Sequence, residues 1–390
     1  MAATNHEGVV RQSIDPGVMG MIQEREQDQG SGDARGARAP EGDAVLSVRD
    51  LVVEFPTVMG TVHALNGVTF DVPRGQVLGI VGESGCGKSV TARAILQIVE
   101  RPGRVTEGTI TLRRGEGEVD ITGLGADSPA MRALRGKDIA MVFQEPMSSL
   151  NPVYTIGAQI EEAVLIHQTR DRKEAARRAV DILQQVGMPN PAGVASSYPH
   201  QLSGGMRQRA MIAMAMSCNP TLLIADEPTT ALDVTTEAQI LELIRGVRDR
   251  TGMSVMFITH SMGVVAQLCD EVVVMYLGRV MERASVDDIF HDPKHPYTRA
   301  LLRSTPRMGA DRKQPLEVIE GSVPDPYTTV GGCPFHPRCP DVIPGVCDSV
   351  VPVEKRLGDG HIVHCHLYDA EDPTHDTTVS TTNELTEAEA

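Results

Sequence analysis

The chain has 390 residues, enough for two or three domains, and 41% of them are hydrophobic, which excludes wholesale disorder. Its 36 Lys and Arg stand against 52 Asp and Glu, and the net charge of −16 argues against a general nucleic-acid binder. The sequence contains no run of about 20 apolar residues, so a membrane span is not expected. Its first residues do not show a basic start followed by an apolar stretch, so a secretory signal is not expected either. Seven Cys in a chain this long favour a reducing, cytosolic location.

The acidic residues gather at the two ends. Residues 1–43 hold eight acids and four bases, and residues 369–390 hold seven acids and no Lys or Arg. Neither segment shows a sustained hydrophobic period, so both are predicted to be disordered tails.

Between these tails, short apolar runs alternate with amphipathic segments from residue 44 onward. Strands are expected at Val45–Val48, Leu51–Phe55, Val68–Val72, Val77–Val81, Thr221–Ala225, Ser254–Thr259 and Glu271–Tyr276. Helices are expected at Ser89–Val99, Ile156–His167, Lys173–Val186, Thr235–Arg250 and Met262–Leu268. The alternation indicates an α/β fold with a parallel sheet.

The strand that ends at Val81 runs into a glycine-rich loop of the pattern G-x-x-x-x-G-K-[ST]. Glycines let the backbone turn so that its N–H groups face one concavity, and the next helix presents its positive dipole end there. The loop predicts a nucleotide phosphate site in which Lys88 reaches the β- and γ-phosphates and Ser89 ligates Mg²⁺. Its members are Gly82, Glu83, Ser84, Gly85, Cys86, Gly87, Lys88 and Ser89.

Two carboxylates follow the apolar strand that ends at Ala225. Asp226 suits a ligand of Mg²⁺, directly or through water, and Glu227 suits a base that polarises a water for attack on the γ-phosphate. An Asp-Glu pair after a strand can also cap a helix or face solvent. Its occurrence downstream of a phosphate loop favours the ATPase interpretation.

Further motifs resemble those of ABC transporter nucleotide-binding subunits. Leu202–Arg209 reads Leu-Ser-Gly-Gly-Met-Arg-Gln-Arg, like the family's signature segment. Gln144 resembles the Q-loop glutamine, Ala231-Leu232-Asp233 the D-loop, and His260 the switch histidine. Phe55 stands where the family places an aromatic ring against adenine.

The resemblance implies a P-loop NTPase ABC cassette, with a RecA-like core, an antiparallel β subdomain and an α-helical subdomain at about residues 145–218. Each chain then holds half of two ATP sites, and the signature turn of one subunit faces the phosphate loop of another. Ser203, Gly204 and Gly205 would meet the γ-phosphate from across the dimer.

Individual roles follow from the same resemblance. Gln144 would sense Mg²⁺ and the attacking water, and His260 would orient that water together with Glu227. Asp233 would help set the subunit contact, although it could equally be an N-cap of the helix from Thr235. His260 could likewise be an ordinary surface or core histidine.

Four segments resemble the ATPases of oligopeptide, dipeptide and nickel importers. They are Glu145–Pro152, Leu202–Arg209, His295–Leu302 and Gly332–Pro340. The resemblance implies an ATPase at the cytoplasmic face of the cell membrane, where it pairs with a second ATPase subunit beneath two transmembrane permeases. An extracytoplasmic substrate-binding protein completes the implied assembly, and nucleic acid is not an expected partner. A heterodimer is implied, and a homodimer remains open. Import of nickel or another small solute, or a soluble ABC ATPase not tied to transport, are the alternatives.

The limits expected from this pattern are an ABC domain at 44–285 and a C-terminal domain at 286–368. The C-terminal region contains four Cys spaced C-x5-C-x7-C-x17-C in a Pro-rich segment, which suggests one metal centre in a small domain. Four thiolates suit either a [4Fe–4S] cluster or tetrahedral Zn²⁺. The resemblance to peptide-importer ATPases favours the cluster, and free cysteines are the third alternative. The four are Cys333, Cys339, Cys347 and Cys365.

Overall fold

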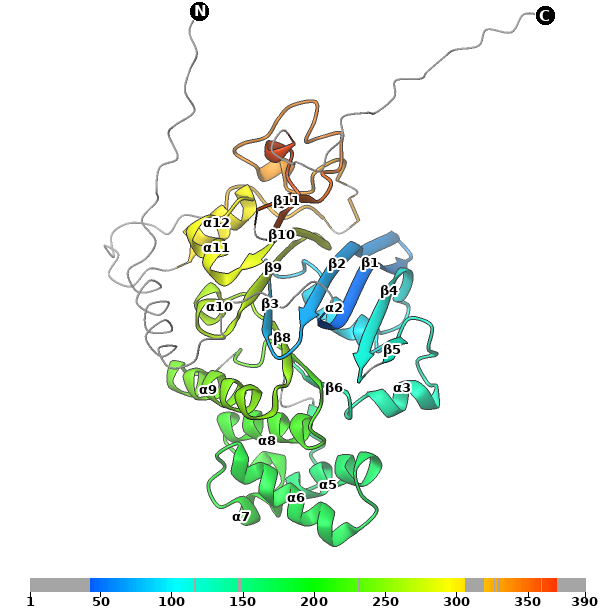
Figure 1. Ribbon diagram of the computed structural model, residues 1–390, viewed down its shortest axis with the longest axis vertical. Helices are drawn as coiled ribbons and strands as arrows, with labels where there is room; N and C mark the ends of the chain where they lie inside the picture. The colour runs from blue at the N-terminus through cyan, green and yellow to red at the C-terminus, as the bar shows by residue number, and fades with distance from the viewer. Residues whose placement is uncertain are drawn as a thin grey trace, which may run out of the picture.

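The structure is a computed structural model that describes residues 43–369, except 116, 146–148, 231, 306–318, 326, 329 and 359. The two predicted tails therefore lie outside the described residues, apart from their inner ends at 43 and 369. Figure 1 shows two sheets, a group of helices at one end and a C-terminal segment at the other.

An eight-stranded mixed sheet forms the centre of the molecule. In order across the sheet, its strands are β11 (Lys355–Leu357), β12 (His361–Val363), β10 (Arg279–Ser285), β9 (Glu271–Tyr276), β3 (Val77–Val81), β8 (Ser254–Ile258), β7 (Leu222–Asp226) and β6 (Ile139–Val142). Strands β9, β3, β8, β7 and β6 are parallel, which confirms the predicted parallel sheet, although β6 was not among the predicted strands. All residues of β3, β7 and β8 are buried, which explains why these strands are apolar apart from Asp226 and Ser254.

The other edge of this sheet is antiparallel, which the sequence analysis did not predict. β10 pairs with β9, and β12 then pairs with both β10 and β11. The C-terminal segment is therefore bonded to the core sheet, and Phe335 belongs to the same buried cluster as Tyr276 of β9.

A second, four-stranded antiparallel sheet lies beside the first, in the order β2-β1-β4-β5. Its strands are β1 (Ala44–Thr57), β2 (Gly60–Pro73), β4 (Arg104–Arg114) and β5 (Gly117–Asp120). The two runs predicted at its start, Val45–Val48 and Leu51–Phe55, form one strand, because register shifts let β1 continue past Arg49 and Asp50.

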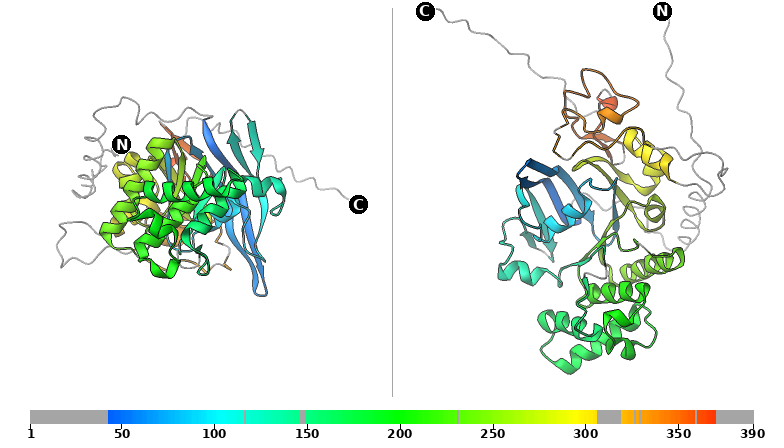
Figure 2. Two further views of the ribbon diagram at one scale, coloured as in Figure 1. Left: turned by 90° about the horizontal axis from the view of Figure 1, so that it is seen from below. Right: turned by 180° about the vertical axis from the view of Figure 1, so that it is seen from behind.

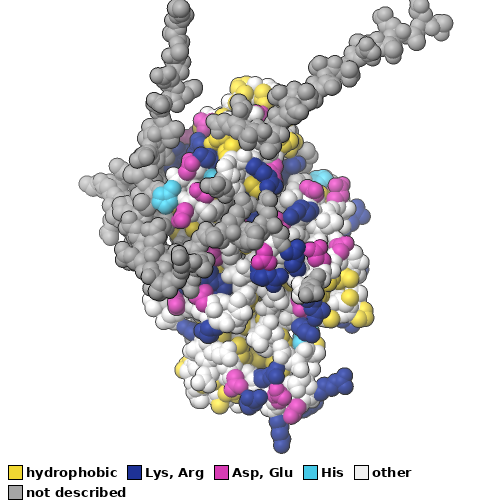
Figure 3. Space-filling view, in the orientation of Figure 1, with side chains coloured by type: hydrophobic (Ala, Val, Ile, Leu, Met, Phe, Trp, Pro, Cys, Tyr) yellow, Lys and Arg dark blue, Asp and Glu magenta, His cyan; other side chains and the backbone are white. Residues whose placement is uncertain are grey.

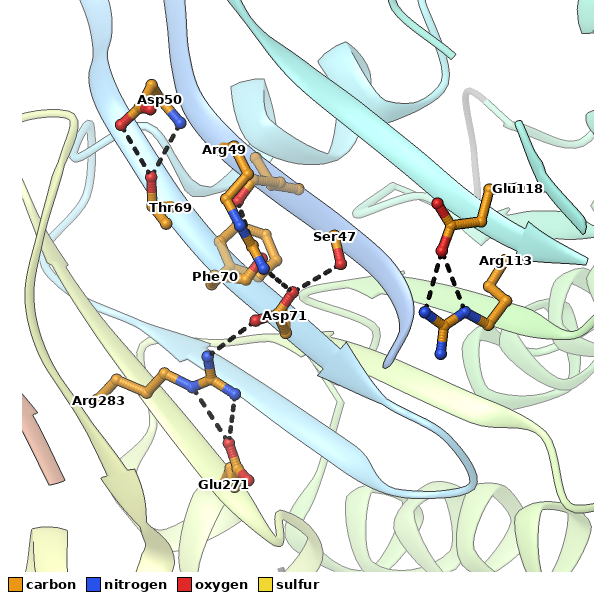
Figure 4. A network of polar contacts seen from close by, with 11 residues as sticks. Ser47, Arg49, Asp50, Thr69, Phe70, Asp71, Arg113, Glu118, Glu271 and Arg283 are labelled. Atoms are coloured by element: carbon orange, nitrogen blue, oxygen red, sulfur yellow. Dashed lines mark hydrogen bonds and ion pairs between the residues drawn. The ribbon is translucent and has the colours of Figure 1, made fainter. Parts of the chain in front are cut away.

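The two sheets are joined by charged side chains as well as by packing (Figure 4). Asp71 of β2 accepts hydrogen bonds from Ser47 Oγ at 2.7 Å and Arg49 Nη2 at 2.6 Å. Its other oxygen lies 3.7 Å from Arg283 Nη1 of β10, and Arg283 Nη2 donates to Glu271 Oε2 at 2.8 Å. This network links the antiparallel sheet to the core sheet that carries the phosphate loop.

Helices cover the core sheet and form a separate group below it, as the front and back views show (Figures 1 and 2). Around the sheets lie α2 (Lys88–Ile95), α3 (Pro129–Leu134), α9 (Val234–Thr251), α10 (Met262–Leu268), α11 (Val286–His291) and α12 (Pro296–Ser304). The group below contains α5 (Ile156–His167), α6 (Arg172–Gln185), α7 (Pro191–Ala195) and α8 (Gly204–Met216). Short 3₁₀ helices lie at Pro199–Gln201, His336–Arg338 and His366–Tyr368.

Helix boundaries follow local side-chain chemistry. Thr155 and Asp171 accept backbone N–H bonds at the starts of α5 and α6, which fixes where each helix begins. The helix predicted at Ser89–Val99 is shorter, because Gln97 adopts a left-handed φ of 51° just after it ends.

On the face seen in Figure 3, basic and acidic side chains are interspersed over the described surface. Among the helices that the structure describes, none has both the length and the apolar character needed to cross a bilayer.

Candidate ATP site

The predicted phosphate loop connects β3 to α2, at the carboxyl end of a central parallel strand. Gly82 opens it with a φ of 153°, and a Cβ at this position would lie 2.1 Å from the carbonyl oxygen of Met275 in β9. Only glycine fits this close approach of two backbones. The loop is therefore held directly against the core sheet, and α2 points its N-terminus into the site.

Lys88, the first residue of α2, folds back over the loop. Its Nζ donates to the carbonyl oxygens of Gly82 at 2.8 Å and Glu83 at 3.0 Å, and the residue is 5% exposed. Both acceptors are neutral carbonyl oxygens, so an anion that enters the loop can replace them as partners of the ammonium. The position predicted for a phosphate-binding lysine is thus inside the loop.

Ser89 and Asp226 meet beside this loop. Ser89 Oγ donates to Asp226 Oδ1 at 2.9 Å, across a sequence separation of 137 residues. Burial raises the pKa of Asp226, while the hydrogen bond from Ser89 lowers it. A hydroxyl and a carboxylate next to a phosphate site form the oxygen donor set that Mg²⁺ prefers, so these two residues fit the predicted metal role.

Two of the three residues predicted to be catalytic, Gln144 and His260, contact the carboxylate of the third, Glu227. Gln144 Nε2 donates to Glu227 Oε2 at 3.1 Å, and His260 Nδ1 lies 3.3 Å from Glu227 Oε1. Glu227 immediately follows β7, Gln144 follows β6 and His260 follows β8, so three neighbouring strands deliver them. The side chain of His260 is 63% exposed, whereas that of Glu227 is 14% exposed.

A third contact to this carboxylate was missed in the sequence analysis. Thr230 Oγ1 donates to Glu227 Oε2 at 3.0 Å, and Glu227 itself has a left-handed φ of 45°. A strained backbone at a non-glycine residue is typical of functional sites. The signal available in the sequence was the hydroxyl three residues after the glutamate, in Glu227-Pro228-Thr229-Thr230.

The signature segment begins helix α8. Ser203 is its N-cap and accepts a hydrogen bond from the backbone N–H of Met206 at 3.3 Å. A Cβ on Gly204 would meet nothing within 4 Å, so the approach to this helix start is open. Front and back views both place α8 in the lower helical group and α2 beside the sheets (Figures 1 and 2).

Two predicted residues have other contacts in this chain. Asp233 is the N-cap of α9: it accepts from Thr236 N at 2.9 Å, and this bond holds its pKa below the usual value. Phe55 of β1 packs against Gly103, where a Cβ would lie 2.4 Å from the ring. Ala231 of the predicted D-loop lies outside the described residues, as do residues 146–148 beside Gln144.

The four C-terminal cysteines lie near one another, three of them buried and Cys339 half-buried. Burial, with smaller contributions from the nearby thiols of Cys333, Cys339 and Cys347, raises the pKa of Cys365 to about 12. Burial also raises the pKa of Cys339 to about 11. The sulfur of Cys347 accepts a hydrogen bond from Ile343 N at 3.4 Å.

The backbone N–H groups of Phe335, Asp341 and Leu367 act in the opposite direction to burial and lower the pKa of Cys333, Cys339 and Cys365 respectively. Hydrogen bonds from backbone N–H groups to sulfur, such as the one to Cys347, suit thiolates that carry charge on a bound group. Within the described ranges, no three His, Cys, Asp or Glu side chains are close enough to hold a single metal ion. The four predicted ligands are thus neighbours, but the described residues do not form an assembled metal site.

A phosphate loop, an oxygen donor pair for Mg²⁺ and a glutamate beside them on a parallel sheet define a P-loop ATPase. The comparisons with known proteins identify the class further. The model described as "ABC transporter" matches residues 65–230, and the model described as "Oligopeptide/dipeptide transporter, C-terminal region" matches residues 281–347.

Curated relatives extend this match over most of the chain. The chain is 49% identical over 326 residues to the probable peptide ABC transporter ATP-binding protein y4tR of Sinorhizobium fredii, covering 84% of this chain and 96% of that protein. It is 47% identical over 328 residues to the dipeptide transport ATP-binding protein DppD of Bacillus subtilis, covering 84% and 96%. The chain belongs to the family of peptide ABC transporter ATP-binding proteins.

A solved ATP-binding cassette, dimeric in a post-hydrolysis state and bound to ADP and Pi, superimposes with a TM-score of 0.55. It is 26% identical and covers 62% of this chain and 98% of its own. The predicted family, the ABC cassette fold and the ATPase activity are confirmed.

Proposed function

We propose that this chain hydrolyses ATP to drive import of peptides through a membrane transporter. The observation that carries the proposal is the convergence of Gln144 and His260 on Glu227, beside the Ser89–Asp226 pair. The peptide specificity is supported by relatives named for peptide and dipeptide transport, which share 47–49% of their residues with the chain.

In the proposed mechanism, Lys88 leaves its carbonyl acceptors and binds the β- and γ-phosphates of ATP. Ser89, Asp226 and Gln144 would hold Mg²⁺, which when bound would neutralise charge at the phosphates. Glu227 accepts the proton of the attacking water, and His260 and Thr230 hold its carboxylate in place. The hydrogen bond from Thr230 and the 3.3 Å contact with His260 Nδ1 are present before nucleotide arrives and would restrict the orientation of Glu227.

The other half of each ATP site comes from a second ATPase subunit. Ser203, Gly204 and Gly205 of one subunit would approach the γ-phosphate held by its partner, because a helix start with open space at Gly204 accepts an anion. Asp233 would lie at the subunit contact and Phe55 against adenine. The dimeric state of the solved cassette described above supports this arrangement. We propose a heterodimer.

The complete assembly also contains two permeases and an extracytoplasmic binding protein, with this chain at the cytoplasmic face of the membrane. We place the ABC domain at 44–285, its helical subdomain at about 145–218 and the C-terminal domain at 286–368, with acidic tails at 1–43 and 369–390.

The proposal is tested by co-expression with the permease pair and binding protein of its own genome. The tagged chain is expected to purify from the membrane fraction with both permeases, and peptide is expected to stimulate its ATP hydrolysis. Co-purification with nucleic acid or ribosomes and without permeases would contradict transport. Stimulation by nickel complexes but not by peptides would contradict the substrate class.

We also propose that the four C-terminal cysteines hold a [4Fe–4S] cluster. The proximity of the four thiols and the hydrogen bond from Ile343 N to the Cys347 sulfur support this choice, since such donors accompany cluster thiolates. The cluster would fix the chain segments that carry the cysteines, because metal ligation stabilises small, core-poor regions.

Protein purified without oxygen is expected to be brown and to contain about four irons per chain. Cys347→Ala is expected to lose that iron, whereas Cys218→Ala, at a separate buried cysteine, is expected to keep it. Iron and zinc are measured together by elemental analysis. Colourless protein with one zinc per chain, or with neither metal, would contradict the cluster.

A further inference from the structure

The loop between Cys333 and Cys339 reaches the phosphate loop through one side chain. Arg338 Nη1 donates to Glu83 Oε2 at 2.7 Å, and Arg338 Nη2 donates to Glu83 Oε1 at 3.1 Å. The two residues are 255 positions apart in the sequence. The side chain of Arg338 is only 4% exposed and that of Glu83 is 25% exposed, so this bidentate pair is largely shielded from water.

Arg338 is fixed by further contacts on every side of its guanidinium. Nε donates to the carbonyl oxygen of Glu320 at 3.1 Å, and Nη1 donates to Tyr276 Oη at 3.2 Å. The guanidinium carbon lies 5.8 Å from the ring centre of Tyr276 and 6.0 Å from that of Phe335. A planar fork held by both hydrogen bonds and aromatic faces has one orientation, which lysine cannot reproduce.

Glu83 is also held at its backbone by the C-terminal part of the chain. Its N–H donates to Tyr297 Oη at 2.9 Å, and Tyr297 of α12 packs against Phe335 with ring centres 5.2 Å apart. Phe335 in turn meets Tyr276 edge to face at 5.4 Å. The second residue of the phosphate loop is thus gripped at two points by residues beyond 285.

The position of Glu83 makes this grip relevant to nucleotide binding. The carbonyl oxygen of Glu83 accepts a hydrogen bond from Lys88 Nζ at 3.0 Å, so the glutamate lies within the loop that must bind a triphosphate. An unneutralised carboxylate there would repel the polyanion, and more strongly where water is excluded. Arg338 supplies the opposite charge from outside the loop.

We propose that Arg338 is a positioning residue of the ATP site, which neutralises Glu83 and holds the phosphate loop in its binding conformation. The inference rests on the proposed ATP-hydrolysing role of this loop and is independent of what the cysteines bind. Because the loop 333–339 carries both Phe335 and Arg338, it connects the C-terminal segment mechanically to the ATP site.

The test compares Arg338→Met, Arg338→Lys, Glu83→Gln and the double variant Glu83→Gln/Arg338→Met in the full chain. Arg338→Met is expected to raise the KM and Kd for ATP by roughly 5- to 150-fold, the range of typical coupling between sites, with a smaller change in kcat. The double variant is expected to bind ATP more tightly than Arg338→Met alone, because no unpaired carboxylate is left. Arg338→Lys, which keeps the charge, is expected to fall between Arg338→Met and the wild type.

Arg299→Met is the matched control, because Arg299 also ties down the C-terminal segment, through Pro293 O at 3.0 Å and Tyr368 Oη at 3.0 Å, without touching the phosphate loop. Its KM for ATP is expected to stay at the wild-type value. Thermal unfolding is measured for every variant, so that loss of fold is separated from loss of affinity.

An unchanged KM in folded Arg338→Met would overturn the proposal, as would a double variant that binds ATP no better than the single one. If Arg338→Met does not fold, the same decision rests on Arg338→Lys with and without Glu83→Gln. Both the wild type and the variants are assayed together with the companion ATPase subunit, and an inactive wild-type assembly would instead count against the ATPase function, which keeps the two failures distinguishable.

Discussion

Glu227→Gln is expected to abolish most ATP hydrolysis while ATP binding is retained. The substitution preserves the size of the side chain and its hydrogen bonds with Gln144 and Thr230, but it removes the basic oxygen that would accept a proton from water. General bases contribute about 10²- to 10⁴-fold to rate, and the loss of kcat should fall in that range. With hydrolysis blocked and ATP bound, the subunits are expected to accumulate as a closed dimer.

Steady-state phosphate release and size-exclusion chromatography in Mg-ATP measure these two effects. Glu242→Gln is the matched control, since Glu242 lies on α9 with a side chain that is 71% exposed and pairs only with Arg245 in the described contacts. Its turnover should equal that of the wild type. Normal turnover of Glu227→Gln would remove Glu227 from the role of base.

Lys88→Ala is expected to weaken nucleotide binding by about 10- to 150-fold, since hydrogen bonds to charged groups contribute about 1.5–3 kcal/mol each. The ammonium lies inside the phosphate loop and is bonded to the carbonyl oxygens of Gly82 and Glu83, so a triphosphate can replace these neutral acceptors. Removing it leaves the loop with its backbone N–H groups but without the charge aimed at the phosphates.

Isothermal titration with ATP and ADP measures the affinity directly. Lys173→Ala, at an exposed lysine in the first turn of α6, is the control and should bind as the wild type does. The affinity for ATP is expected to fall more than that for ADP, because only ATP carries the γ-phosphate. An unchanged ATP affinity would place Lys88 outside the binding site.

Much of the site could be predicted from the sequence because its parts are local. The phosphate loop needs glycines at fixed spacing, and the 2.1 Å approach of Met275 O to a Cβ on Gly82 gives the reason at one of them. Parallel strands bring their carboxyl ends to one edge, so residues that follow β6, β7 and β8 meet without any long-range information.

The elements that escaped prediction depend on contacts between distant parts of the chain. β4 begins at Arg104 and ends at Arg114, and these polar ends do not indicate a strand in the sequence. The strand is formed because it pairs with both β1 and β5. The pair of Arg338 and Glu83 spans 255 positions, and neither residue alone signals the other. Thr230 donates to Glu227 only because the chain turns after β7, and this turn was not predicted.

Uptake of peptide into vesicles tests the central claim most directly. The chain is reconstituted with its companion ATPase and both permeases, and the binding protein is supplied with labelled peptide on the side opposite to ATP. Peptide accumulation is expected to require Mg-ATP and to stop with Glu227→Gln but not with Glu242→Gln. A wild-type assembly that contains every component and consumes ATP but moves no peptide would contradict the account.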